Sequence, residues 1–164
     1  MTNDFLVRIF EHNNWANLEL IRVCLSLTEE QLDAEPQSVT KGNIRRTLIH
    51  LVGSQAWYLS LLTLPVDERM DEALQLADLI ESARSSGDGL LALARGERQP
   101  FSSRLQTGDG YNVDPWVIMV QLINHATEHR EQIKSMLSAL GLTPPSIDGW
   151  DFGEATSALV KIAD

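Results

Sequence analysis

Two histidines in the last third of the chain have the spacing of a metal-binding pair. His125 and His129 lie four residues apart in the run Asn124-His125-Ala126-Thr127-Glu128-His129. On a helix this spacing leaves the two positions roughly 40° apart around the axis and about 6 Å apart along it, so both imidazoles lie on one face. An inward-facing pair of this kind can chelate one metal ion. Short motifs match often by chance, however, and an inward histidine can simply hydrogen-bond a neighbour, so the pair alone leaves both interpretations open.

The helix that carries this pair has clear ends in the sequence. Asp114 and Pro115 are typical of a helix start, where aspartate caps the helix and proline occupies its first turn. Gly141, with two prolines shortly after it, is typical of a helix end. The apolar arc of this helix includes the position of His129 and has His125 at its edge. Its apolar members are Leu122, Ala126, Ile133, Met136 and Leu140.

Three more long amphipathic helices are predicted upstream. Residues 4–26 carry apolar residues at alternating spacings of three and four, interrupted by Asn13, and residues 43–64 form a second helix that Pro65 ends. We expect residues 71–95 to form the third, continuous across the glycines of segment 85–89, with a break there as the alternative. The apolar seam of the first helix is Leu6, Ile9, Ala16, Leu20, Val23 and Leu27.

The four long helices indicate an all-α protein, a four-helix bundle. Between and after them we expect a capped turn at 28–32, a short hairpin or ordered loop within 97–113, and a short final helix at 155–162. Facing helices of a bundle often build metal sites, and His50 of the second helix could meet His125 and His129 in the interior. Three imidazoles with no evident fourth ligand would form an open site, which is typical of catalytic metal centres.

Composition narrows the classes of partner. The 164 residues are most simply one domain, 1–164, with 13 Lys and Arg against 23 Asp and Glu and a net charge of -10. That charge disfavours nucleic acid and anionic membranes as partners. The single cysteine, Cys24, excludes an intrachain disulfide, and the sequence shows no signal pattern and no apolar run of 18 residues. We therefore expect a cytoplasmic protein.

Segments from all parts of the chain carry a family resemblance: Trp15-Ala16-Asn17, Thr47-Leu48-Ile49-His50-Leu51, Asn124-His125-Ala126-Thr127-Glu128-His129-Arg130-Glu131-Gln132-Ile133, and Leu140-Gly141-Leu142-Thr143-Pro144-Pro145 with Asp148. Together they resemble the DinB/YfiT-like family, and the resemblance covers essentially the whole chain. It implies an up-down-down-up four-helix bundle, a divalent metal ion held by His50, His125 and His129, and frequent dimerisation.

The resemblance also suggests what the protein does. Characterised relatives include S-transferases and isomerases that use low-molecular-weight thiols, and others are described as metal-dependent hydrolases. Our leading hypothesis is an enzyme that transfers a small thiol to an electrophilic small molecule, because a metal would hold the thiol as thiolate. A hydrolase that activates water, a non-catalytic metal- or ligand-binding stress protein, and a bundle with merely structural histidines are the alternatives. Imidazole ligands suit several divalent metals, of which zinc or nickel is expected here. Glu128 and Glu131 point away from the histidine face and are expected to be solvated.

Two surfaces are expected to be functional. Trp15 and Trp116 lie off the apolar faces of their helices, and the family resemblance implies dimers, so we expect a homodimer with at least one of them at the interface. The metal pocket should open on a bundle face near Thr47, Ser54 and Trp57.

Overall fold

The fold is given by a computed structural model that describes residues 5–38, 42–69 and 73–162. Four long helices account for most of it: α1 (Phe5–Leu25), α3 (Ile44–Thr63), α4 (Leu79–Ala94) and α5 (Pro115–Ala139). The connections contain two short helices, α2 (Glu29–Asp33) and α6 (Gly149–Ala155), and the 3-10 turns Val66–Glu68 and Leu76–Asp78. A two-stranded antiparallel ribbon, β1 (Leu105–Gln106) and β2 (Asn112–Val113), precedes α5. The expectations of an all-α protein and of a hairpin in this place are confirmed.

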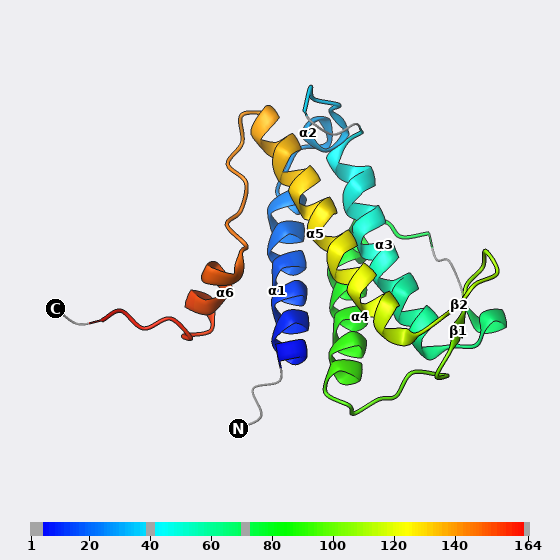
Figure 1. The fold of residues 1–164 in the computed structure, drawn as a ribbon. Helices are drawn as coiled ribbons and strands as arrows, with labels where there is room; N and C mark the ends of the chain where they lie inside the picture. The colour runs from blue at the N-terminus through cyan, green and yellow to red at the C-terminus, as the bar shows by residue number, and fades with distance from the viewer. Residues whose placement is uncertain (1–4, 39–41, 70–72, 163–164) are drawn as a thin grey trace.

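The long helices lie side by side (Figure 1). α5 packs along α3 and also contacts α1, while α4 packs against both α1 and α3. In the view of Figure 1, α1 and α5 run upward, and α3 and α4 run downward. Within the described residues, no helix is long and apolar enough to cross a membrane.

The helix ends follow from local side-chain chemistry. The Asn43 side chain accepts a hydrogen bond from the backbone of Arg46, which satisfies a free N–H at the start of α3. Asp114 stands at the N-cap of α5, but its carboxylate makes an ion pair with Arg104 at 3.3 Å and no capping bond. Past the end of α5, Gly141 has a φ of +74°, a conformation that glycine adopts easily. Both helices therefore begin and end close to their predicted limits.

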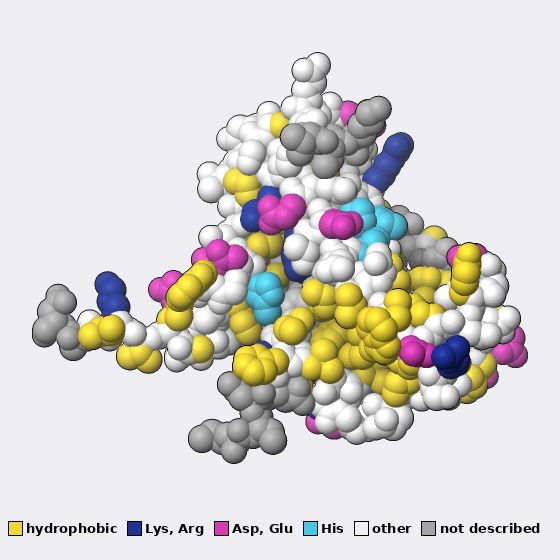
Figure 2. All heavy atoms as spheres, viewed as in Figure 1, with side chains coloured by type: hydrophobic (Ala, Val, Ile, Leu, Met, Phe, Trp, Pro, Cys, Tyr) yellow, Lys and Arg dark blue, Asp and Glu magenta, His cyan; other side chains and the backbone are white. Residues whose placement is uncertain are grey.

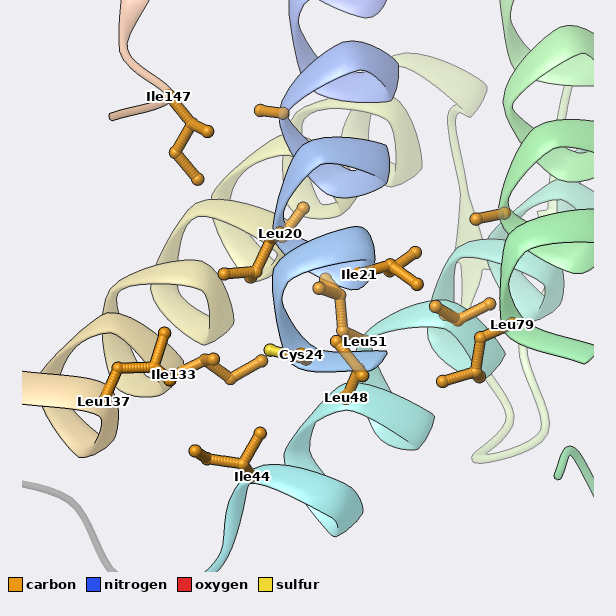
Figure 3. Close-up of a cluster of buried hydrophobic side chains, with 14 of the residues drawn as sticks. Leu20, Ile21, Cys24, Ile44, Leu48, Leu51, Leu79, Ile133, Leu137 and Ile147 are labelled. Carbon is orange, nitrogen blue, oxygen red and sulfur yellow. The ribbon is translucent and has the colours of Figure 1, made fainter. Parts of the chain in front are cut away.

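The main hydrophobic core lies where α1, α3 and α5 meet, and α4 closes one side (Figure 3). A second cluster continues it between the N-terminal half of α1, the C-terminal half of α3, α4 and the first turns of α5. Cys24 belongs to the main core and is fully buried. The fully buried large side chains are Phe10, Leu20, Ile21, Ile44, Leu48, Leu51, Leu62, Leu79, Leu90, Leu105, Leu122 and Ile133.

The predicted seam of α1 is wrong in its first half. Leu6 and Ile9 are 41% and 46% exposed, while the inward positions belong to Phe10, Asn13 and Asn17. Two of these inward residues are amides that hydrogen-bond inside the protein. Because hydrophobic periodicity does not count polar residues as core, it placed the buried face slightly off its true direction.

The predicted helix over 71–95 begins later than expected, at Leu79, after the 3-10 turn Leu76–Asp78; residues 70–72 lie outside the described part. Its glycines do not break it. A Cβ on Gly87 would lie 2.8 Å from the Asn14 side chain, and one on Gly89 would lie 2.6 Å from Leu59. The two glycines therefore permit close packing of α4 on α1 and α3.

The predicted final helix at 155–162 is wrong. The helix in this region is α6, and it starts at Gly149 because Asp148 caps it through the backbone N–H groups of Trp150 and Asp151. Beyond α6, Ser157 has a φ of +57° and the following residues are not helical. Val160 and Ile162 are 85% and 94% exposed, so this apolar run contributes nothing to the core.

Candidate metal centre

The structure brings His50, His125 and His129 together at the junction of α3 and α5. The Nε2 atom of His125 lies 3.1 Å from that of His50 and 3.1 Å from that of His129. One ligand nitrogen from each of the three residues lies within 4.8 Å of the others, so they are positioned to bind one metal ion. His50 is exposed and the other two are half-buried, so the cluster opens to solvent instead of lying in the interior as expected. Figure 2 shows histidine side chains at the surface here, beside a broad hydrophobic area.

Hydrogen bonds among the imidazoles cannot account for this geometry. An imidazole nitrogen carries either one proton or one in-plane lone pair, so His125 Nε2 can satisfy only one of its two 3.1 Å neighbours well. A single ion satisfies all three nitrogens. Nitrogen ligands about 2.05 Å from a tetrahedral ion lie roughly 3.3 Å from each other, close to the two separations observed. The donor set therefore fits a divalent cation.

The surroundings keep two of the ligands neutral. Partial desolvation of its ring against the protein lowers the pKa of His50, and the neighbouring His129 lowers it further. Burial lowers the pKa of His125 to about 4, with smaller contributions from His129 and His50. Because only a neutral imidazole has a free lone pair, both effects favour the form that binds metal.

Gln132, which was not among the residues predicted from the sequence, orients one of the ligands. Its Oε1 lies 2.7 Å from Nδ1 of His129, so Nδ1 carries the proton and Nε2 presents its lone pair to the cluster. The spacing of three residues on one helix could have revealed this contact. On the other helix, the Ser54 hydroxyl is 3.4 Å from Nδ1 of His50, too far for a strong hydrogen bond.

A cavity of about 500 Å³ adjoins His50. Its lining is mostly apolar and includes Ile49, Trp57 and Leu74, with Ser54 as a polar member. Two of the three residues expected at the mouth of the site line it; Thr47 does not, and its hydroxyl donates to the Asn43 carbonyl. Beside the cluster, the Tyr58 ring stands edge-on to His125, with 5.6 Å between ring centroids.

The other candidate residues lie outside this site. His12 makes a 3.0 Å contact from Nε2 to the Ile147 carbonyl, and Trp15 packs against Phe152 of α6, so both hold the C-terminal segment to α1. Glu131 is exposed and forms an ion pair with Lys134 at 2.8 Å.

Glu128 on α5 is exposed, as expected. Burial raises the pKa of the Cys24 thiol to about 12, so Cys24 remains protonated near neutral pH. Within the described residues, the group of possible metal ligands at this place consists of the three histidines.

The helical fold and the convergent imidazoles define a class of all-α protein with three histidines positioned to bind a metal ion. The chain belongs to the DinB family, whose sequence model matches residues 1–161. A crystal structure of a protein from Exiguobacterium sibiricum 255-15, described as a candidate DinB family member, has the same fold with a TM-score of 0.66 and 20% sequence identity. The match covers 86% of this chain and 94% of that one. None of the curated proteins matches the chain.

Proposed function

We propose that the protein is a metal-dependent enzyme of the DinB family whose ion is held by His50, His125 and His129 in an up-down-down-up four-helix bundle. The convergence of three Nε2 atoms at an open position carries this proposal. Structural zinc sites are usually closed by four protein ligands, whereas catalytic sites leave a coordination position for water or substrate.

We infer that the reaction is transfer of a low-molecular-weight thiol to an electrophilic small molecule. When bound, a divalent ion such as zinc or nickel supplies Lewis acidity that lowers the pKa of a thiol and makes it nucleophilic near neutral pH. The sulfur must come from a cosubstrate, because Cys24, the only cysteine, is fully buried and protonated. Gln132 holds His129 in the metal-binding tautomer.

The adjoining cavity supports a small-molecule substrate. Trp57 and Ile49 offer apolar surface beside His50, and Ser54 offers a hydroxyl. The electrophilic carbon would lie against these residues. The thiol would lose its proton to solvent, its sulfur would form the new S–C bond, and the leaving group would depart with the electrons of the broken bond. Polar groups in the lining are few, which suits an uncharged substrate better than a phosphorylated one.

Metal binding is tested first. The wild-type protein, purified without chelator and desalted, should contain about one divalent ion per chain. His50→Ala, His125→Ala and His129→Ala should each lose that ion while circular dichroism still shows a helical, cooperatively melting protein. His12→Ala is the control and should keep the metal, since the His12 ring contacts the Ile147 carbonyl and the rings of Trp15 and Phe152, away from the three histidines. Full metal content in all four variants would show the ligand assignment to be wrong.

Turnover assays separate the three functional candidates. Thioether formation from a small thiol and an aryl halide, absent in His125→Ala, would establish the transferase. Hydrolysis of an activated ester without added thiol, again lost with the metal, would instead favour the hydrolase that the same open site could support. Stoichiometric metal without turnover in either assay would leave a metal- or ligand-binding protein.

We further propose a homodimer formed through the apolar face of α1 and α5. Leu6 and Ile9 face Trp116 and Val120 across a groove of about 240 Å³, and Trp116 is 63% exposed. A specific interface between two such faces should bury more than about 1,000 Å² in total. In sedimentation at micromolar concentration the wild type should be a dimer and Trp116→Asp a monomer. Trp150→Asp, on the 74% exposed indole of α6, is the control. A monomeric wild type would refute the proposal.

A further inference from the structure

A chain of buried hydrogen bonds crosses the protein and joins all four long helices. Nη1 of Arg130 on α5 donates to the Oδ1 atoms of Asn13 and Asn17 on α1, both at 2.7 Å. Nδ2 of Asn17 donates to Oε1 of Gln55 on α3 at 2.8 Å, and Nε2 of Gln55 donates to the Ser86 hydroxyl on α4 at 2.8 Å. None of these five residues is more than 5% exposed.

The chain touches the two metal-binding helices close to their histidines. Arg130 directly follows His129 on α5, and Gln55 lies five residues after His50 on α3, which is about one and a half helical turns. Asn17 joins the two, since its oxygen accepts from Arg130 and its nitrogen donates to Gln55. The helices α3 and α5 are therefore connected twice. In the interior the hydrogen bonds of Asn17 link Gln55 to Arg130, and at the surface the imidazoles of the two helices meet.

Stability alone explains this arrangement poorly. Within the described residues Arg130 has no carboxylate in an ion pair, and the buried Nδ2 of Asn13 has no hydrogen-bond partner. Burying such polar groups costs folding free energy. Replacing a whole buried network with apolar residues often leaves the stability of the protein unchanged or raises it. Hydrogen bonds, unlike apolar contacts, constrain both distance and direction, so a buried network can fix one register between packed helices.

We propose that Asn17, Gln55 and Arg130 are positioning residues for the metal centre. They hold α3 and α5 in the register that brings the three Nε2 atoms together. This inference rests on the proposed metal binding, but it concerns interior residues that touch neither metal nor substrate.

The test removes the network without leaving unpaired partners. A variant with Asn13→Leu, Asn17→Leu, Gln55→Leu and Arg130→Met should melt cooperatively, at or near the wild-type temperature. Its affinity for Zn²⁺, measured by titrating metal-free protein against a chromophoric chelator, should fall at least about tenfold, as for other residues that orient metal ligands indirectly. Gln55→Met alone keeps the hydrogen bonds of Arg130 to α1 and should lower the Zn²⁺ affinity by a smaller factor. This single variant still tests the inference if the quadruple variant does not fold.

Two controls separate positioning from general destabilisation. Ser86→Ala removes the end of the network on α4, which carries no histidine, and should leave the Zn²⁺ affinity unchanged. Leu90→Ala opens a cavity in the second core cluster and should lower the melting temperature without changing the affinity.

The outcomes distinguish this inference from the proposed function. If the quadruple variant and Gln55→Met both bind Zn²⁺ with wild-type affinity, the inference is wrong, while the proposed metal site is unaffected. If the wild type binds neither Zn²⁺ nor Ni²⁺, the proposed function fails, and crystal structures of the metal-free proteins decide the inference. The Nε2 atoms of His50 and His125 should then lie near 3.1 Å apart in the wild type and more than about 1 Å further apart in the quadruple variant. An unchanged separation would overturn it.

Discussion

Alkaline pH should destabilise this protein through one side chain, Cys24. The thiol is fully buried among core residues of α1, α3 and α5, and burial raises its pKa from 9.0 to about 12. Between these values the unfolded chain gives up the thiol proton and the folded chain keeps it. The unfolded state then binds fewer protons, so the free energy of unfolding falls as the pH rises.

The magnitude follows from the two pKa values. Each pH unit between them costs at most about 1.4 kcal/mol, and the full change from pH 8 to pH 11 is about 2.5 kcal/mol. This is a large part of the roughly 5–15 kcal/mol that stabilises an ordinary domain. Below pH 8 the contribution vanishes, because the thiol is protonated in both states.

The assay is urea unfolding of the wild type and Cys24→Ala at pH 8, 9, 10 and 11. Cys24→Ala should be less stable at pH 8, because it leaves a small cavity, but it should lose less stability than the wild type up to pH 11. Tyrosines and lysines titrate in both proteins, so the difference between the two curves isolates the thiol. Parallel curves would refute the assignment of a buried, neutral thiol, and with it the argument that the nucleophilic sulfur must come from a cosubstrate.

Three further predictions concern the site and the packing around it. His125→Ala should abolish metal binding and change the metal-free melting temperature by only a few degrees, because the half-buried ring contributes little to the core; loss of helical circular dichroism would contradict this. Gln132→Leu should weaken Zn²⁺ binding about tenfold to a hundredfold in a chelator titration, because His129 loses the acceptor that fixes its tautomer, and an unchanged affinity would show the contact to be incidental. Gly89→Ala should destabilise the protein by about 1–3 kcal/mol in denaturant unfolding, because its Cβ would lie 2.6 Å from Leu59. Gly96→Ala is the comparison: no atom lies within 4 Å of its Cβ, so its effect would come only from the positive φ of that residue.

The sequence predicted what depends on local chemistry. The Asp114-Pro115 pair and Gly141 defined α5, and the four-residue spacing of His125 and His129 placed both rings on one face. His50 joined the set because facing helices of a bundle can combine their side chains, and the family resemblance supported that choice, although its own helix shows only a histidine beside the apolar face.

What the sequence could not predict depends on partners distant along the chain. Asn17 and Arg130 have the polar side chains of surface residues, and only the packing of α1 against α5 buries them. For the same reason, the apolar periodicity of α1 did not predict which of its faces is buried. The prediction of a final helix after α6 was wrong for the opposite reason, because Val160 and Ile162 are apolar but lie exposed, away from the core.

The three histidines come from helices that are far apart in the chain, and His125 follows His50 by 75 positions. An unfolded chain would have to close that long loop around one ion, so the folded state binds the metal much more tightly. By mass action, free ion at 100 times its dissociation constant would add about 2.7 kcal/mol to the free energy of unfolding. The lifetime of the protein against proteases that attack the unfolded chain would then rise and fall with the supply of metal, and its abundance in the cell would report that supply.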